Sequence, residues 1–470
     1  MPGNARFATT RLWRGLSLNQ AALLGQSLGS VVIAFYAMSN ASLAVLMAYL
    51  IFGVAGLVIS RRGGTQVRIY LTVYGLAAVA TVALAAVYTA AYGNPYWGGG
   101  SDEFYFEQIG IAFAEHYSIW DYNSIRGNLV VVWESTTGYL YLMGLLAKFS
   151  QWFGGFHTVV PRLFNAMCLG LVSVLTYHIS LRLQLQRRTA LAAALFAGLF
   201  PYLMWISVQS LRDIFQALLV LTVVYLWLPD HKNGWLYPVP VLFVVSSLLI
   251  IPIWEIRKGQ AFVLIILIVI AYISNRWSWT PTNLFFLRIP ILAVGVLALR
   301  EFYTVFQDGF ELYFMAASQY TEYQAAGGSS ESIGLSLVIY ETPIFPLGWA
   351  LRTAYVFVSP LPVSFWPAHN AWLSIGTVIQ ILCLPFLFFG IKHSLRLPQW
   401  RVLILAFVMF FIAMAMFTVT FRHSTYWMVM SIPIAALGWE RYRGRHINVL
   451  MATGATLILL GMIYLGIKVL

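Results

Sequence analysis

Two adjacent carboxylates follow the end of a long apolar segment. Asp102 and Glu103 come directly after the run Gly98-Gly99-Gly100-Ser101 and shortly before Tyr105. A carboxylate at a membrane surface can take a proton from an attacking hydroxyl group, and a low-dielectric setting raises its pKa toward the useful range. The same residues also suit a solvated loop that caps a helix. The pair therefore indicates general-base chemistry or a helix cap, and does not decide between them.

A third acidic residue ends another apolar segment. Asp213 follows Ser210-Leu211-Arg212, and a charge beside the membrane costs about 2.5–3.5 kcal/mol on insertion scales and normally has a function. Arg212 and Asp213 together could form an interface anchor. Adjacent residues point in different directions on a helix, however, so we expect Asp213 to face a cavity.

A basic group follows a third apolar segment, in the sequence Glu255-Ile256-Arg257-Lys258-Gly259. Arginine can contact a phosphate through two hydrogen bonds and lysine supplies a point charge, so this group fits a phosphate or diphosphate ligand. An ordinary turn between two helices is the alternative. Four further cationic or histidine residues are expected on the same side of the membrane: Arg162, Arg352, Arg422 and His423.

The elements that must position these residues are membrane helices. Of 470 residues, 60% are hydrophobic and only 9% are charged, whereas soluble domains carry about 25% charged residues. This composition excludes a water-soluble enzyme, a disordered chain and a nucleic-acid-binding protein. The net charge of +12 comes from short basic clusters between apolar segments, which is typical of topology signals. Cys168 and Cys383 lie inside apolar runs, so neither a disulfide framework nor a cysteine metal site is expected.

Apolar segments of about 20 residues predict about 13 transmembrane helices. They fall near 19–37, 41–60, 69–92, 160–181, 189–207, 214–229, 237–254, 261–274, 283–299, 371–391, 402–420, 425–439 and 447–467. We expect a single all-α polytopic membrane domain over residues 1–470. Two long outer loops, 93–159 and 300–370, exceed the usual loop length of about 4–6 residues and are expected to carry function.

The orientation follows from the short basic loops, which favour the cytoplasm. Placing the N-terminus inside also brings the other basic clusters inside, provided that residues 136–152 do not cross the membrane. We therefore expect 136–152 to form an interfacial or re-entrant helix on the outer surface. Of the 16 acidic residues, all except Asp230 and Glu440 then lie outside. This asymmetry indicates a working site on the outer face, unless the outer loops are simply long and polar.

The order of these motifs resembles the GT-C-fold glycosyltransferases that use polyprenyl-phosphate sugars, and in particular the branch of the protein O-mannosyltransferases and aminoarabinose transferases. The resemblance covers about residues 69–275, and 420–440 weakly. It rests on Asp102-Glu103-x-Tyr105, Glu134 to Tyr139, Pro161-Arg162-Leu163, Trp205-Ile206-Ser207 leading to Leu211-Arg212-Asp213, and Arg257-Lys258-Gly259. It implies a GT-C-like core at 69–275 that contains outer loop 93–159. Two extra helices precede it within 1–68, and variable helices follow in 276–470.

The resemblance also implies the residue roles. Asp102 would be the catalytic base, Glu103 or Asp213 would support it or share a divalent cation (Mg²⁺ or Mn²⁺) with it, and Lys258 would contact the lipid phosphate. Arg257 and Arg162 are expected to help hold this phosphate. Residues expected to contact substrate are Tyr105, Glu134, Tyr139, Arg212, Arg352, Arg422 and His423.

The expected activity is transfer of a sugar from a polyprenyl-phosphate donor to a hydroxyl group of a lipid, glycan or protein. It would occur on the outer face of the cytoplasmic membrane, in cell-envelope glycan biosynthesis and without nucleic acid. No cofactor is required by the pattern, although a divalent cation is compatible with it. The alternatives are an envelope-polysaccharide polymerase or ligase that acts on diphosphate-linked chains, a flippase for lipid-linked sugars, and a non-enzymatic envelope scaffold.

Overall fold

The computed structural model describes residues 17–61, 63–97, 102–124, 137–229, 238–275, 349–358, 368–417, 421–442 and 444–469. Helices account for 87% of these residues, and no strand occurs among them. Six described helices are long and apolar enough to cross a bilayer. The expectation of an all-α multi-pass membrane protein is thereby confirmed at this level.

The six candidate spans coincide with predicted ones. They are α1 (Leu18–Ser39), α2 (Leu43–Ser60), α3 (Gly64–Tyr92), α7 (Val159–Arg182), α11 (Val239–Ile256) and α16 (Ala368–Ser394). A seventh span exists if α8 (Arg187–Leu199) and α9 (Pro201–Ser207), which are bent by 49°, form one crossing.

Five other predicted spans in the described residues fall on helices that are not among these candidates. They are α10 (Asp213–Trp227), α12 (Lys258–Asn275), α17 (Arg401–Phe417), α18 (Thr425–Arg441) and α19 (His446–Val469). Three further short elements are α15 (Trp349–Val358) and the 3₁₀ turns η6 (Pro398–Trp400) and η7 (Phe421–Ser424). The predicted span 283–299 lies outside the described residues, as does most of loop 300–370. The number of about 13 spans stays a prediction.

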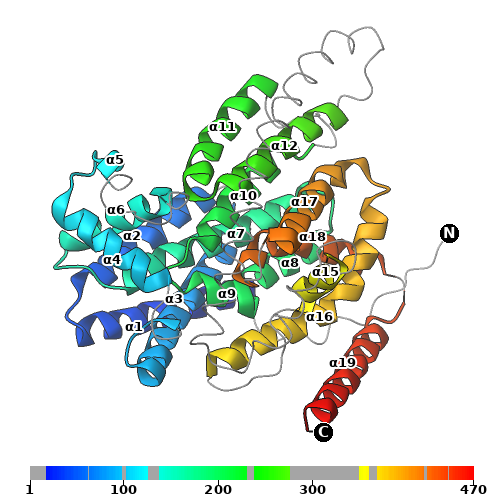
Figure 1. Ribbon diagram of the computed structural model, residues 1–470, viewed down its shortest axis with the longest axis horizontal. Coiled ribbons are helices and arrows are strands. Elements are labelled where there is room, and N and C mark those ends of the chain that lie inside the picture. The colour runs from blue at the N-terminus through cyan, green and yellow to red at the C-terminus, as the bar shows by residue number, and fades with distance from the viewer. Residues whose placement is uncertain are drawn as a thin grey trace.

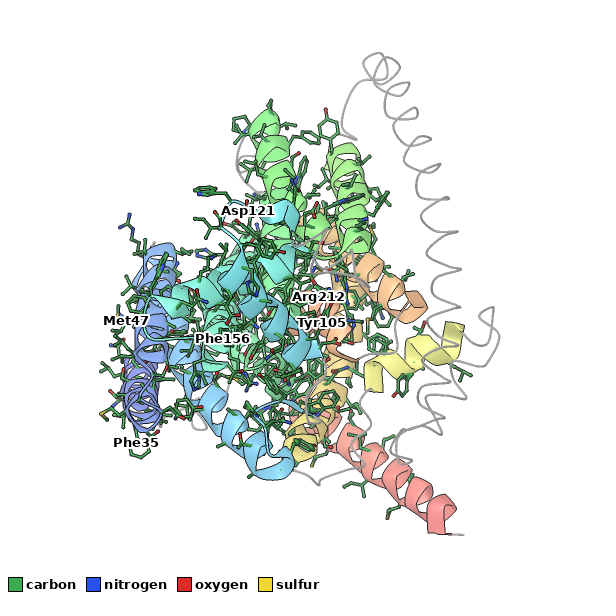
Figure 2. All side chains as sticks on the ribbon, turned by 60° about the vertical axis from the view of Figure 1, so that its left-hand side comes forward. Phe35, Met47, Tyr105, Asp121, Phe156 and Arg212 are labelled. Atoms are coloured by element: carbon green, nitrogen blue, oxygen red, sulfur yellow. The ribbon has the colours of Figure 1, made fainter. Side chains whose placement is uncertain are left out.

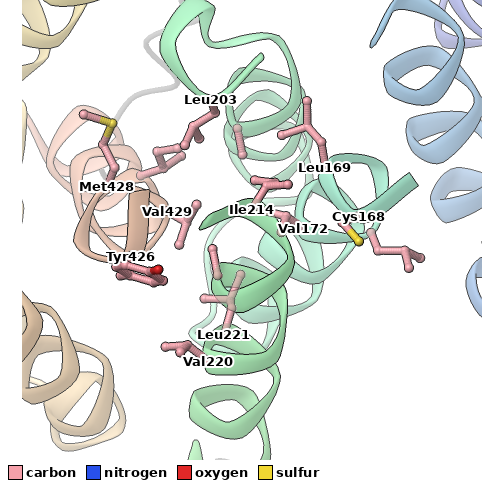
Figure 3. Packing of buried hydrophobic residues seen from close by; sticks show 14 of the residues in the cluster. Cys168, Leu169, Val172, Leu203, Ile214, Val220, Leu221, Tyr426, Met428 and Val429 are labelled. Atoms are coloured by element: carbon pink, nitrogen blue, oxygen red, sulfur yellow. The ribbon is translucent and has the colours of Figure 1, made fainter. Parts of the chain in front are cut away.

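Helix α7 lies at the centre of the bundle (Figure 1). Its apolar window is 89% buried, compared with 28% for α1 and 22% for α11. Cys168 and Val172 of α7, Ile214 and Val220 of α10, and Val429 of α18 all belong to one buried hydrophobic cluster (Figure 3). Helices α7, α10 and α18 are therefore held together by one continuous core.

The two N-terminal helices lie at one edge of the bundle, where Phe35 of α1 and Met47 of α2 point outward (Figure 2). Helix α1 packs closely on α3, because a Cβ atom added to Gly29 would lie only 2.9 Å from the carbonyl oxygen of Gly75. The lipid-facing side chains of these helices, including Phe35 at 71% exposure, are apolar, as expected for a surface in hydrocarbon.

The described part of segment 93–159, the predicted first outer loop, contains α4 (Asp102–His116), α5 (Tyr122–Ser124) and α6 (Thr137–Gln151), which gather at one side of the molecule (Figure 1). Helices α4 and α6 bury a small core of their own that contains Phe113, Tyr139 and Met143. The backbones approach closely, because a Cβ atom on Gly110 would lie 2.9 Å from that of Met143. Helix α6 covers the segment that we expected not to cross the membrane, and it is not among the candidate spans.

Two breaks in the chain create the irregular backbone around the candidate site. Gly93 ends α3 with a φ of 74°, a left-handed conformation that glycine adopts without steric cost. Between α9 and α10, residues 208–212 leave the helix and place Asp213 at the first position of α10. Non-helical backbone at membrane depth must find its hydrogen-bond partners within the protein, and those partners form the site described next.

Candidate functional site

Glu103 of α4 is buried and binds the break between α9 and α10. Its side chain is 2% exposed, and its Oε1 atom accepts a hydrogen bond from the backbone N–H of Ser210 at 2.8 Å. Its Oε2 atom accepts another from the backbone N–H of Trp97 at 3.2 Å. Glu103 therefore joins two irregular segments of the chain. One lies at Trp97, before α4, and the other at Ser210, before α10.

The charge of Glu103 is balanced by Arg162, which lies near the start of α7. The Nη2 atom of Arg162 lies 3.5 Å from Oε1 of Glu103 and donates to the carbonyl oxygen of Pro95 at 2.6 Å. Arg162 is completely buried, and within the described part of the chain its Nε and Nη1 atoms have no hydrogen-bond partner. Because one partner is a backbone carbonyl and the other a buried carboxylate, these contacts support a structural role for Arg162 rather than direct phosphate binding.

One helical turn after Glu103, the buried carboxylate of Glu107 accepts hydrogen bonds from three hydroxyl groups. Glu107 accepts hydrogen bonds from Tyr96 at 2.8 Å, from Thr158 at 2.7 Å and from the hydroxyl group of Ser210. Burial raises the pKa of the Glu107 carboxyl group, although Arg162 and the three hydroxyl groups act in the opposite direction. We refer to Glu103, Glu107, Arg162 and Ser210 as the Glu103 cluster.

Asn165 supports the same break from α7. Its Nδ2 atom donates to the carbonyl oxygens of Gln209 and Leu211, each at 2.7 Å. Together with the N–H of Ser210 bound by Glu103, three consecutive residues of the break have their backbone groups paired by side chains. Such pairing removes the cost of burying free peptide groups, and it fixes where α10 begins.

Asp213 occupies the first turn of α10 and is 2% exposed. Its Oδ1 atom lies 3.8 Å from Nη1 of Arg257, which separates α11 from α12. Arg257 also contacts Nε2 of His423 in η7. A negative charge at a helix N-terminus is favoured by the helix dipole, so Asp213 is stabilised both by α10 and by Arg257.

Polar residues continue one turn deeper into the bundle. The hydroxyl group of Tyr426 donates to Oε1 of Gln216 at 2.6 Å and lies 3.4 Å from Oδ1 of Asp213. Both side chains are buried. We refer to Asp213, Arg257, His423, Tyr426 and Gln216 as the Asp213 cluster. It draws on α10, the α11–α12 junction, η7 and α18.

The two clusters adjoin each other through residues 210–213 and α6. Arg212 lies 5.9 Å from the ring centroid of Phe106 and 3.5 Å from the carbonyl oxygen of Ile256, and Figure 2 labels it together with Tyr105 of α4. Burial raises the pKa of Tyr139 in α6, and Glu107, Asp213 and Glu103 raise it further through their negative charges. Tyr139 is thus within electrostatic reach of both clusters.

Segment 93–159 also contacts the end of α11. The hydroxyl group of Tyr122 donates to Oε2 of Glu255 at 2.6 Å, and a Cβ atom on Gly138 would lie 2.8 Å from that of Glu255. Glu255 directly precedes Ile256-Arg257-Lys258, so the acidic loop and the basic group share one face of the protein.

The remaining predicted site residues divide into two groups. Asp102 starts α4 and is partly exposed, Tyr105 lies one turn further on, and Lys258 starts α12 beside Arg257. Arg352 and Arg422 belong to α15 and η7, but their side chains lie outside the described part of the structure, as does Glu134 entirely. The roles proposed for these three residues stay predictions.

Several residues that build the site were not singled out from the sequence. They are Glu107, Asn165, Gln216 and Tyr426. Glu107 lies four residues after Glu103 and therefore on the same face of α4, which is a signal that the sequence contains. Asn165, Gln216 and Tyr426 are single polar residues in apolar helices, and their significance depends on contacts that only the tertiary structure reveals.

Within the described residues, no group of three or more histidine, cysteine, aspartate or glutamate side chains could hold a metal ion. The expectation that Asp102 shares a divalent cation with Glu103 or Asp213 gains no support from the geometry of Glu103, which is already bound to protein donors. In comparisons with known proteins, the chain matches no family model, no curated protein and no solved structure.

Proposed function

We propose that this protein is a membrane glycosyltransferase that moves a sugar from a polyprenyl-phosphate donor to a hydroxyl group of a lipid, glycan or protein acceptor. The observation that carries the proposal is the convergence of acidic and basic residues at one place. The start of α4, the start of α10 and the start of α12 are tied together by the contacts Glu103–Ser210 and Asp213–Arg257. A GT-C-like arrangement of about 13 helices belongs to the same proposal.

The proposed reaction needs a base and a cationic site for the leaving group. Asp102 accepts the proton of the acceptor hydroxyl group while the new glycosidic bond forms. The bond between the sugar carbon and the phosphate oxygen breaks, and the polyprenyl phosphate leaves with the electron pair. Lys258 and the exposed edge of Arg257 stabilise its negative charge. Asp213 acts as a positioning residue, because it orients Arg257 through their ion pair.

The site is proposed to face the outside of the cytoplasmic membrane, with the N-terminus inside. This sidedness is supported by the short basic loops, and by helix α6, which is not among the candidate spans. With α6 outside the bilayer, α4, α6 and the α11–α12 junction belong to one membrane face. A donor with a long apolar tail could approach such a site from the lipid.

The test is a transfer assay on purified protein in lipid nanodiscs with radiolabelled polyprenyl-phosphate sugars. Asp102→Asn is expected to lower the release of sugar from the donor by about 10²–10⁴-fold, the usual contribution of general-base catalysis. Glu115→Gln is the matched control, since Glu115 lies on the same helix and is exposed. Unchanged transfer by folded Asp102→Asn protein would contradict the proposed role of Asp102.

A second candidate function is favoured by the contact between Arg257 and His423. A polymerase or ligase that acts on diphosphate-linked chains would use arginine and histidine to hold the diphosphate. In such an enzyme, His423→Gln would abolish activity on a diphosphate-linked substrate and Asp102→Asn would be tolerated. The opposite pattern supports the glycosyltransferase that we propose.

A further inference from the structure

Three buried polar side chains from three helices form a chain of hydrogen-bonding groups beneath Asp213. Gln216 of α10 is fully buried, Tyr426 of α18 is 3% exposed and Gln260 of α12 is 8% exposed. Tyr426 donates to Oε1 of Gln216 at 2.6 Å, and the side chain of Gln260 lies against the same hydroxyl group. The central tyrosine is thus bracketed by two amides.

Both ends of this chain lack a partner. The Nε2 atom of Gln216, a donor, and the Oε1 atom of Gln260, an acceptor, are buried and have no hydrogen-bond partner among the described residues. Buried polar atoms in native proteins almost always have partners, and each one that lacks a partner costs free energy. One unpaired donor and one unpaired acceptor in the same small region call for a group that can both accept and donate.

The position of these residues suggests where that group comes from. Gln216 lies three residues after Asp213 on α10, and Gln260 lies three residues after Arg257 at the start of α12. Both therefore lie about one helical turn deeper than the Asp213–Arg257 pair. The side chain of Arg257 is 21% exposed, whereas the side chain of Asp213 is only 3% exposed, so the open side of the cluster is next to the cation.

We propose that Gln216, Tyr426 and Gln260 form a subsite for a hydroxyl group of the donor sugar, next to the phosphate held at Arg257. This inference rests on the proposed function. A hydroxyl group donates to Oε1 of Gln260 and accepts from Nε2 of Gln216, so it satisfies both unpaired atoms at once. An apolar group would leave both unpaired, and an anion would be repelled by Asp213, whose Oδ1 atom is 3.4 Å from the Tyr426 hydroxyl group.

Such a subsite selects sugars by their hydroxyl groups. A site built from buried hydrogen-bonding groups rejects a ligand that lacks the matching hydroxyl, because the protein groups are then left without partners. The subsite distinguishes a sugar-bearing lipid from bare polyprenyl phosphate, which has a phosphate for Arg257 and no hydroxyl groups for the glutamines.

The experiment compares two probes in phosphatidylcholine nanodiscs: polyprenyl phosphate alone and a panel of polyprenyl-phosphate-linked hexoses. The measured quantity is the ratio of the two affinities, obtained by native mass spectrometry or tryptophan fluorescence.

Gln260→Met removes the unpaired acceptor and leaves the Tyr426–Gln216 hydrogen bond in place. Gln216→Met is the second variant, used also if Gln260→Met does not fold. Gln380→Met is the matched control, because Gln380 is buried to the same extent and its Nε2 atom is bound to Phe357.

The expected result is that Gln260→Met weakens binding of the best sugar-bearing lipid by about tenfold, as for loss of one buried hydrogen bond, and leaves polyprenyl phosphate binding unchanged. Gln380→Met changes neither. The inference alone is overturned if wild type and both variants give the same affinity ratio, which would mean that only water occupies the cluster. If wild-type protein binds neither probe, the proposed function fails and this inference fails with it.

Discussion

The backbone N–H of Ser210 donates to Oε1 of Glu103 at 2.8 Å, across 107 residues of sequence. This bond joins helix α4 to the break that precedes α10. Because Ser210 lies three residues before Asp213, Glu103 determines where Asp213 is placed against Arg257. The carboxylate that follows Asp102 thus has a positioning role, and Asp102 remains the residue proposed to act on substrate.

Removing Arg162 should destabilise the fold strongly. Glu103 would then be an uncompensated buried charge, and breaking a buried ion pair in this way costs about 3–5 kcal/mol. We expect Arg162→Met to lower the free energy of unfolding by this amount in a denaturant titration in detergent. The double variant Arg162→Met/Glu103→Met should recover part of the loss, while Arg401→Met, at an exposed position, should change little. Wild-type stability of Arg162→Met would contradict the structural role of this ion pair.

Replacing Asn165 should loosen the break between α9 and α10. Asn165→Leu removes hydrogen bonds to two buried carbonyl oxygens, and each lost bond costs about 1 kcal/mol. We expect about 2 kcal/mol lower stability and faster hydrogen exchange at residues 208–213. Thr176→Val is a control on the same helix, because the Thr176 hydroxyl group bonds only to the carbonyl of its own helix at Val172. Equal exchange rates in the two variants would argue against the support that Asn165 provides.

The buried carboxyl group of Glu107 should make stability depend on pH. Its pKa is raised in the folded protein from 4.5, so the folded state binds more protons than the unfolded state above that pH. Stability therefore falls as the pH rises from 4.5 through the raised pKa, by at most about 1.4 kcal/mol per pH unit for one proton. Melting temperatures measured against pH should show a smaller decline for Glu107→Gln than for wild type. Glu115→Gln, on an exposed position of the same helix, should keep the wild-type decline.

The sidedness of α6 can be tested by labelling. Trp120 and Trp152 flank α6 and are 84% and 75% exposed, so cysteines at these positions should react. In a background without Cys168 and Cys383, both Trp120→Cys and Trp152→Cys should be labelled by a membrane-impermeant reagent added from outside. Leu395→Cys, in the loop between α16 and η6, should be protected until the membrane is opened. Labelling of only one of the two tryptophan positions from outside would mean that residues 136–152 cross the bilayer.

The helices themselves were predictable from local sequence. Apolar runs and basic loops identified α1, α2, α3, α7, α11 and α16 as spans, because a bilayer requires long continuous apolar segments whatever their neighbours. The amphipathic segment at 136–152 was separated from the spans by the charge distribution alone. The acidic pair at the start of α4 and the basic pair at the α11–α12 junction were also found from residue type and position.

The different roles of the site residues could not be predicted from the sequence. Asp102 and Glu103 are adjacent and chemically similar, and only packing against Arg162 and Ser210 buries one of them and leaves the other partly exposed. Asn165, Gln216 and Tyr426 look like isolated polar residues in apolar helices until α7, α10 and α18 come together. Helix formation follows from hydrogen bonds between residues four apart. Most contacts of the site, in contrast, join segments tens to hundreds of residues apart, as Glu103–Ser210 and Asp213–Arg257 do, and the tertiary structure alone brings these partners together.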